Sequence, residues 1–367
     1  MAWMPKRNSL DQQQLKALNR IADGGNNFVT GDPGTGKSVV LAHAAKEWRT
    51  SHPSDKICAI TYTNALVAYL EADLSPMNIT TMTVHRFIRL SNRELYDLVL
   101  VDEAQDLEID WAKDIKRFGR RVAFFGDFGQ ALYEGRADRG VLDDMFKTHE
   151  SLDLGMDYRL PLNIRKLVKV MFPDRQFSSE VYRLMANAQI PLFHAKAWNE
   201  EMDFVIRKAK AHAVAGSPVA VLFEAKKRIF RFFYTVLGDD YKAKVDLDTI
   251  NDELKRRNLP FRFLGNGIGD LKESNDKPLT YVMTWHSSKG LDFETVILPD
   301  LSRSMCRDNP FYVAMTRATR NLILSYSGSP NNQIKKAMTC EAVCPITSDK
   351  YDQKKSSSDG AVQGSLF

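Results

Sequence analysis

The sequence has few cysteines and no long apolar run. Its four cysteines, Cys58, Cys306, Cys340 and Cys344, are too few and too scattered for a disulfide framework, which is typical of proteins from a reducing cytoplasm. No stretch approaches the ~20 apolar residues that a membrane-spanning helix needs. The first ten residues, MAWMPKRNSL, have no apolar core that could serve as a secretory signal. We therefore expect a cytoplasmic protein that has no membrane partner.

Length and charge leave several classes of function open. A chain of 367 residues is long enough for two or three domains, each with its own core. The net charge of +5 permits binding to a polyanion such as nucleic acid. This charge does not by itself indicate a nucleic-acid partner, because many solvated surfaces are mildly basic.

A glycine-rich stretch, GDPGTGKS at residues 31–38, follows an apolar strand at 27–30 and precedes an amphipathic helix. This is the context that the P-loop pattern requires. Glycines are needed because backbone N–H groups must close around phosphate oxygens, where a Cβ would block the approach. Lys37 would reach the β- and γ-phosphates and Ser38 would hold Mg²⁺. The stretch predicts that a nucleoside triphosphate and Mg²⁺ are bound by Gly31, Gly34, Thr35, Gly36, Lys37 and Ser38.

A second strand, LVLV at residues 98–101, is apolar on both faces and is typical of a buried parallel sheet. Asp102 and Glu103 follow at its carboxyl end, where open α/β sheets bind their ligands. One carboxylate can hold Mg²⁺ through water while the other polarises the attacking water. Two acids after a strand could also form a solvated turn, but together with the P-loop they indicate a nucleotide hydrolase.

Further segments follow in a fixed order. They are LDQQQLKAL, GDPGTGKS, ITYTNA, TVHRF, LVLVDEAQD, FFGDFGQALYEGR, DYR, VMTWHSSKGLDF and FYVAMTRA. Together they resemble the UvrD/Rep-like branch of superfamily 1 DNA helicases, from Leu10 to about Tyr326. The resemblance implies an α/β fold of two RecA-like P-loop NTPase lobes, each a parallel sheet flanked by helices, with the ATP cleft between them. We expect the first lobe at 1–150, the second at 151–347 and a disordered tail at 348–367.

The resemblance also assigns roles in ATP hydrolysis. Glu103 would be the general base, and Ser38 and Asp102 would hold the metal. Arg159 and Arg317 resemble paired arginine fingers, delivered from the second lobe. The remaining assignments are adenine contact by Gln14, base stacking by Tyr158, γ-phosphate sensing by Gln130 and nucleotide contact by Gly290 and Asp292. Asp292 stands where the family usually has a glutamate that contacts the ribose.

Residues that would grip single-stranded DNA are implied in the same way. Hydroxyls and amides suit phosphate contact without sequence readout, and aromatic rings can stack on bases. The alternative for each residue is a purely structural role in the core or in a loop. For Phe87, DNA binding and a structural role are equally supported. The expected DNA-binding residues are Thr61, Tyr62, Thr63, Asn64, Thr83, His85, Phe87, Thr284 and His286.

Two departures from the family pattern suggest a minimal motor. Gly135 stands where relatives carry an aromatic residue that stacks on bases, so translocation could be differently built. The spacing of the motifs also leaves no room for the large insertion that relatives carry in each lobe. Movement on single strands is still expected, whereas strong unaided unwinding is doubtful.

The polar tail ends on two large apolar residues. QGSLF at residues 363–367 resembles the bacterial sliding-clamp-binding peptide, in which Leu366 and Phe367 would enter an apolar pocket. Gln363 and Ser365 complete the match, and a flexible tether would raise the local concentration of the motor at the clamp. A nondescript tail and a different partner are the alternatives.

The leading interpretation is an ATP-dependent DNA translocase or helicase with 3′ to 5′ movement, recruited by the sliding clamp in DNA repair or replication at the nucleoid. Its partners would be single-stranded or forked DNA, the clamp and an accessory protein such as a nuclease. The alternative is a nucleotide-switched ATPase that binds single-stranded DNA or a protein without unwinding. A phage, plasmid or anti-phage setting and an RNA-directed relative also stay open.

Overall fold

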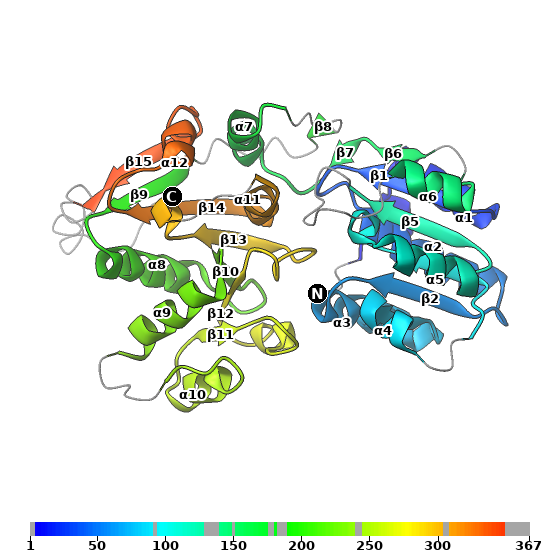
Figure 1. Ribbon diagram of the computed structural model, residues 1–367, viewed down its shortest axis with the longest axis horizontal. Coiled ribbons are helices and arrows are strands. Elements are labelled where there is room, and N and C mark those ends of the chain that lie inside the picture. The colour runs from blue at the N-terminus through cyan, green and yellow to red at the C-terminus, as the bar shows by residue number, and fades with distance from the viewer. Residues whose placement is uncertain are drawn as a thin grey trace. The chain divides into compact units, whose positions relative to one another are not determined.

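The computed structural model describes residues 4–90, 94–127, 139–148, 151–174, 180–181, 189–238, 244–303 and 308–348. The chain divides into two compact units (Figure 1). Unit 1 comprises Met1–Arg159 and Phe177–Arg183, and unit 2 comprises Leu160–Gln176 and Leu184–Phe367. Each unit is built around its own parallel sheet.

The sheet of unit 1 has six parallel strands in the order β3-β2-β4-β5-β1-β6. The strands are β1 (Asn27–Gly31), β2 (Ile57–Thr61), β3 (Thr80–Thr83), β4 (Leu98–Val101), β5 (Val122–Gly126) and β6 (Leu152–Leu154). All residues of β2, β4 and β5 are buried. Such continuous burial is expected where helices cover both faces of a parallel sheet.

Two separate cores confirm that both faces of this sheet are covered. Successive strand residues point to opposite faces, so Leu98 and Leu100 lie in one core and Val99 and Val101 in the other. The helices α1 (Gln12–Ala22), α2 (Lys37–Ser51) and α3 (Asn64–Leu74) pack on the first face. The helices α4 (Val84–Arg89), α5 (Ile109–Phe118) and α6 (Arg139–Phe146) pack on the second. Short 3-10 turns occupy η1 (Arg7–Ser9), η2 (Ser75–Met77) and η3 (Ala104–Asp106).

The sheet of unit 2 has seven parallel strands in the order β11-β12-β10-β13-β14-β9-β15. These are β9 (Ile190–Ala195), β10 (Val219–Phe223), β11 (Phe261–Phe263), β12 (Thr280–Thr284), β13 (Phe293–Leu298), β14 (Ala318–Ser327) and β15 (Val343–Thr347). The helices are α7 (Leu162–Met171), α8 (Trp198–His212), α9 (Lys226–Leu237), α10 (Ile250–Arg256), α11 (Asp308–Met315) and α12 (Asn332–Ala337), with 3-10 turns η5 (Leu271–Ser274) and η6 (Leu301–Arg303). One of its cores joins α8, α9 and α10 to the sheet.

The predicted fold class, two parallel-sheet α/β units flanked by helices, is confirmed. The division of the chain differs from the expected boundary near residue 150, because β6 pairs with β1 and extends the first sheet. A two-stranded ribbon, β7 (Met156–Asp157) with β8 (Glu180–Val181), also belongs to unit 1. Arg159, expected to come from the second lobe, therefore lies in unit 1. Within the described residues, no helix combines the length and the apolar character that a membrane span requires.

Candidate active site

The loop between β1 and α2 is shaped by its glycines. Gly34 has φ 87° and Gly36 has φ 85°, a left-handed conformation that L side chains rarely adopt. A Cβ on Gly36 would lie 2.5 Å from Gln14 Nε2, and one on Gly34 would collide with Asp157 Oδ1 and lie 2.7 Å from Arg159 Cβ. The loop therefore depends on glycine at both positions. Without side chains there, its backbone N–H groups can close around a phosphate chain.

Lys37, at the first position of α2, lies across this loop. Its Nζ donates to the carbonyl oxygens of Gly31 at 2.7 Å and Asp32 at 3.0 Å. Loss of hydration lowers the pKa of Lys37, while the nearby carboxylates of Asp127 and Glu103 act to raise it. An amine held by backbone carbonyl oxygens at a glycine-rich loop fits a site that receives a polyanion such as a triphosphate.

Ser38 and Asp102 bring together two of the oxygens that Mg²⁺ prefers. Ser38 Oγ donates to Asp102 Oδ2 at 2.7 Å, and Asp102 Oδ1 accepts from Glu103 N at 3.0 Å. Burial, followed by the neighbouring Glu103, raises the pKa of Asp102 to about 6. Among the described residues, no three or more His, Cys, Asp or Glu side chains are placed so that together they could hold a metal ion. Mg²⁺ usually needs only one or two protein ligands beside substrate phosphates and water, so this pair could hold it.

Glu103 is held in an unusual conformation. Its φ is 55°, in the left-handed region, and such strain in a non-glycine residue often marks a functional site. Gln105 Nε2 donates to Glu103 Oε2 at 2.5 Å, and Gln105 Oε1 accepts from Asp127 N at 3.0 Å. Gln105 therefore ties the carboxylate of Glu103 to the end of β5. Gln105 was not among the residues predicted from the sequence, although it stands within the DEAQD run.

The N-terminus of α1 is joined to the P-loop. Asp11 and Gln14 form a reciprocal capping box, and Gln14 Nε2 donates to Thr35 O at 3.0 Å. Tyr158 donates its hydroxyl to Asp11 Oδ2 at 2.6 Å, and its backbone N–H donates to Gly34 O at 3.0 Å. Gln14 and Tyr158 thus both lie at the P-loop. Asp11 was missed, although an acid three residues before a glutamine is a readable capping signal.

In unit 2, the expected nucleotide residues lie near one another. Arg317 is only 2% exposed, and its Nε donates to Val313 O at 3.0 Å. Its Nη1 is 3.8 Å from Asp292 Oδ1. Gly290, with φ 77°, lies two residues before Asp292. Arg317 is therefore held within unit 2 by the last turn of α11 and lies beside Asp292.

Several expected DNA-binding residues lie where the neighbouring strands β2 and β3 end. Thr63 caps α3 by accepting from Leu66 N at 3.3 Å, and Thr83 caps α4 by accepting from Arg86 N at 3.2 Å. The rings of Tyr62 and His85 contact each other with centroids 5.5 Å apart. Asn64 is exposed.

In unit 2, Thr284 is buried and hydrogen-bonds Ser287 Oγ at 2.9 Å, whereas His286 is exposed. The loop after β12 therefore presents the imidazole of His286 to solvent, while the hydroxyl of Thr284 helps to shape the turn.

Two of the expected DNA contacts do not fit the structure. Phe87 is 0% exposed and packs in the core, 6.1 Å from the ring of Tyr96. Thr61, the last residue of β2, is 1% exposed. Neither side chain can reach a nucleic-acid strand in this conformation, so both are corrected to structural positions. Gln130, Gly135 and the clamp-binding residues Gln363, Ser365, Leu366 and Phe367 lie outside the described residues.

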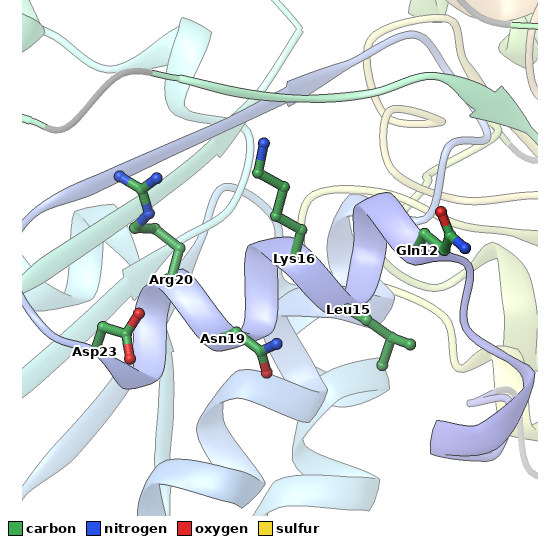
Figure 2. A pocket seen from close by; sticks show the side chains of 6 residues that line it. All are labelled: Gln12, Leu15, Lys16, Asn19, Arg20 and Asp23. Atoms are coloured by element: carbon green, nitrogen blue, oxygen red, sulfur yellow. The ribbon is translucent and has the colours of Figure 1, made fainter.

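A shallow hollow of about 400 Å³ lies along α1 and does not include the P-loop. It is lined by Gln12, Leu15, Lys16, Asn19, Arg20 and Asp23. Lys16 and Arg20 extend from the same side of the helix (Figure 2). Because its lining comes from one exposed helix, this hollow is separate from the nucleotide site.

Comparison with protein families agrees with this geometry. Residues 14–136 match the model of the AAA domain, and residues 279–325 match that of the UvrD-like helicase C-terminal domain. The chain therefore carries one segment similar to an AAA domain and one similar to a UvrD-like helicase C-terminal domain. The second match agrees with the resemblance to UvrD-like helicases over that part of the chain. A comparison with curated proteins finds no match.

Three solved structures that are similar to this chain are described as helicases. The arterivirus nonstructural protein 10 helicase (15% identity, TM-score 0.44) aligns with 89% of this chain and 63% of its own. The helicase of PRRSV (15%, 0.46) aligns with 88% and 55%. A Pif1 helicase structure described as unwinding forked double-stranded DNA (15%, 0.47) aligns with 96% and 98%. The chain thus spans less than two thirds of the two viral helicase chains.

Proposed function

We propose that this protein couples ATP hydrolysis to movement along single-stranded DNA in the 3′ to 5′ direction, as a minimal superfamily 1 motor. The observation that carries the proposal is the shared sheet edge in unit 1. Asp102 N, at the end of β4, donates to Ile60 O at 2.8 Å, two residues before Tyr62. One backbone hydrogen bond thus joins Asp102, which carries the proposed metal-binding carboxylate, to the end of β2. The expected DNA contacts begin directly after β2.

The proposed roles follow from the site. Lys37 and the N–H groups of the P-loop bind the triphosphate, and Ser38 and Asp102 hold Mg²⁺, which neutralises the developing charge when bound. Glu103, oriented by Gln105, takes the proton of the attacking water. Gln14 and Tyr158 receive the base, and Asp292 and Gly290 are further proposed nucleotide-binding residues. Gln130, Arg159 and Arg317 complete the proposed catalytic set.

Displacement of streptavidin from end-biotinylated oligonucleotides tests the movement and its direction. With ATP and Mg²⁺, we expect displacement from the 5′ end and little from the 3′ end, because a 3′ to 5′ motor arrives at the 5′ end. The Glu103→Gln variant should bind the oligonucleotide and displace nothing. Strand binding that depends on ATP, without displacement from either end, would contradict a motor and favour the nucleotide-switched binding protein.

We further propose that the sliding clamp recruits the motor through residues 363–367, in repair or replication. The sequence QGSLF supports this, because it pairs an orienting glutamine with two apolar anchors. A labelled peptide of residues 351–367 should bind purified bacterial clamp saturably, and the Leu366→Ala, Phe367→Ala peptide should not. Absence of saturable binding by the native peptide at tens of micromolar would overturn this part of the proposal.

A further inference from the structure

A third aromatic ring, that of Trp111, lies beside the rings of Tyr62 and His85 at the edge of the first sheet. Trp111 lies in the first turn of α5, with its ring centroid 4.8 Å from His85 at an interplanar angle of 76°. Tyr62 lies 6.4 Å from Trp111 at 42° and 5.5 Å from His85 at 65°. The three rings follow β2, β3 and β4, which are neighbours in the sheet. Three separate segments therefore bring one aromatic ring each to a single place.

These three rings are more exposed than two other aromatic residues of the same core. Tyr62 and Trp111 pack against the core of unit 1 and stay half-buried, as does His85. Phe87 and Tyr96, in the same core, are 0% and 8% exposed. The rings of Tyr62, His85 and Trp111 are thus fixed by packing, while part of the surface of each ring faces solvent. That is the arrangement on which a planar base can stack.

We propose that Trp111, together with Tyr62 and His85, forms a stacking platform for the bases of a single nucleic-acid strand. The inference rests on the proposed function, since it deepens the strand-binding part of it. Neither the motif pattern nor the family resemblance assigned Trp111. Arg86, exposed on α4 next to His85, supplies a positive charge for the adjacent phosphate.

The platform is also connected to the hydrolytic site. Helix α5 begins three residues after η3, which contains Gln105, the partner of Glu103. Leu107 N donates to Ala104 O, and Ala112 N donates to Glu108 O, so hydrogen-bonded turns lie at both ends of the segment from Glu103 to Trp111. A strand that presses on Trp111 therefore acts on the segment that orients the general base. We expect Trp111 to matter for stimulation of hydrolysis by the strand.

The test compares Trp111→Ala and Trp111→Phe with Tyr69→Ala, a control at an exposed ring on α3 of the same unit. Binding is measured by anisotropy with labelled oligothymidylate and with the same oligomer carrying abasic sites. Stacking of one base is worth ~1–3 kcal/mol, so Trp111→Ala should weaken binding about 5- to 150-fold. Trp111→Phe should recover most of it, and Tyr69→Ala should bind as the native protein does.

Abasic sites separate stacking from phosphate contact. They should weaken binding by the native protein much more than binding by Trp111→Ala. Equal loss in both proteins, or Trp111→Ala binding as tightly as Tyr69→Ala, would overturn the platform and leave the proposed motor intact. If the native protein bound no strand at all, both proposals would fall. Should Trp111→Ala not fold, Trp111→Phe decides: quenching of tryptophan fluorescence by the oligomer should be largely lost, and unchanged quenching contradicts the platform.

Discussion

At Gly34, both the backbone conformation and the packing around the residue require glycine. Any L residue at its φ of 87° is strained by about 1–2 kcal/mol, and an added Cβ would in addition collide with Asp157. We expect Gly34→Ala to lower ATP affinity at least tenfold, as measured with a fluorescent ATP analogue. Gly216→Ala is the matched control, because Gly216 has φ 79° but nothing within 4 Å of its added Cβ. Equal ATP affinity in the two variants would contradict the role of Gly34.

At the same scale, the structure brings some of the predicted site residues together and buries others, and the difference has a physical reason. Ser38 and Asp102 could be paired in advance because the P-loop and the acidic strand end are both local patterns. His85 and Phe87 could not be separated by pattern alone. In the structure, α4 turns Val84 and Phe87, three residues apart, into the core and leaves His85 half-exposed. The burial of Phe87 follows from the face that α4 presents to the sheet.

The beginning of α1 links helix stability to the nucleotide site. Asp11 caps α1 by accepting from Gln14 N at 2.7 Å and also accepts the Tyr158 hydroxyl. Asp11→Ala should lower the free energy of unfolding by about 1 kcal/mol and weaken ATP binding, because Gln14 and Tyr158 lose their common partner. Asn331→Ala removes the analogous cap of α12, where Asn331 accepts from Ile334 N at 2.9 Å. It should destabilise similarly and leave ATP binding unchanged; a similar ATP affinity for both variants would refute the link.

Whole elements were predicted best where their signal is local. The strand expected at 98–101 is β4, and the strand expected at 27–30 is β1 with one residue added. The expected boundary near residue 150 differed because β6 has only three residues and joins the sheet by pairing with β1, more than a hundred positions earlier. A partner so distant leaves no periodic pattern in the segment itself.

A buried polar network ties α8 of unit 2 to the ends of two strands. Glu201 is 0% exposed and accepts from Asp300 N at 2.7 Å and from Ser325 Oγ at 2.8 Å. Asp300 pairs with Arg228 at 2.9 Å. Burial raises the pKa of Glu201 from the usual 4.5 to about 7, and burial also raises the pKa of Asp300. The folded protein therefore holds a proton on Glu201 more tightly than the unfolded chain does.

This network predicts a pH dependence of stability for the molecule. Because the pKa of Glu201 is higher when folded, its contribution is complete below pH 4.5 and is lost as the pH rises to about 7. The loss is on the order of 3 kcal/mol. Glu201→Gln, which mimics the protonated form, should be more stable than the native protein at pH 8 and should flatten the dependence, as measured by urea unfolding at several pH values. The exposed control Glu341→Gln should retain the native slope, and an unchanged slope in Glu201→Gln would contradict the assignment.

The central claim for the whole molecule is that a nucleic-acid strand drives its ATP hydrolysis. The most direct measurement is the steady-state rate of phosphate release with and without single-stranded DNA, for the native protein and for Glu103→Gln. We expect strong stimulation by the strand and a rate lower by about 10²–10⁴-fold in Glu103→Gln, with ATP binding retained. A rate indifferent to DNA, or no turnover despite ATP binding, would contradict the account.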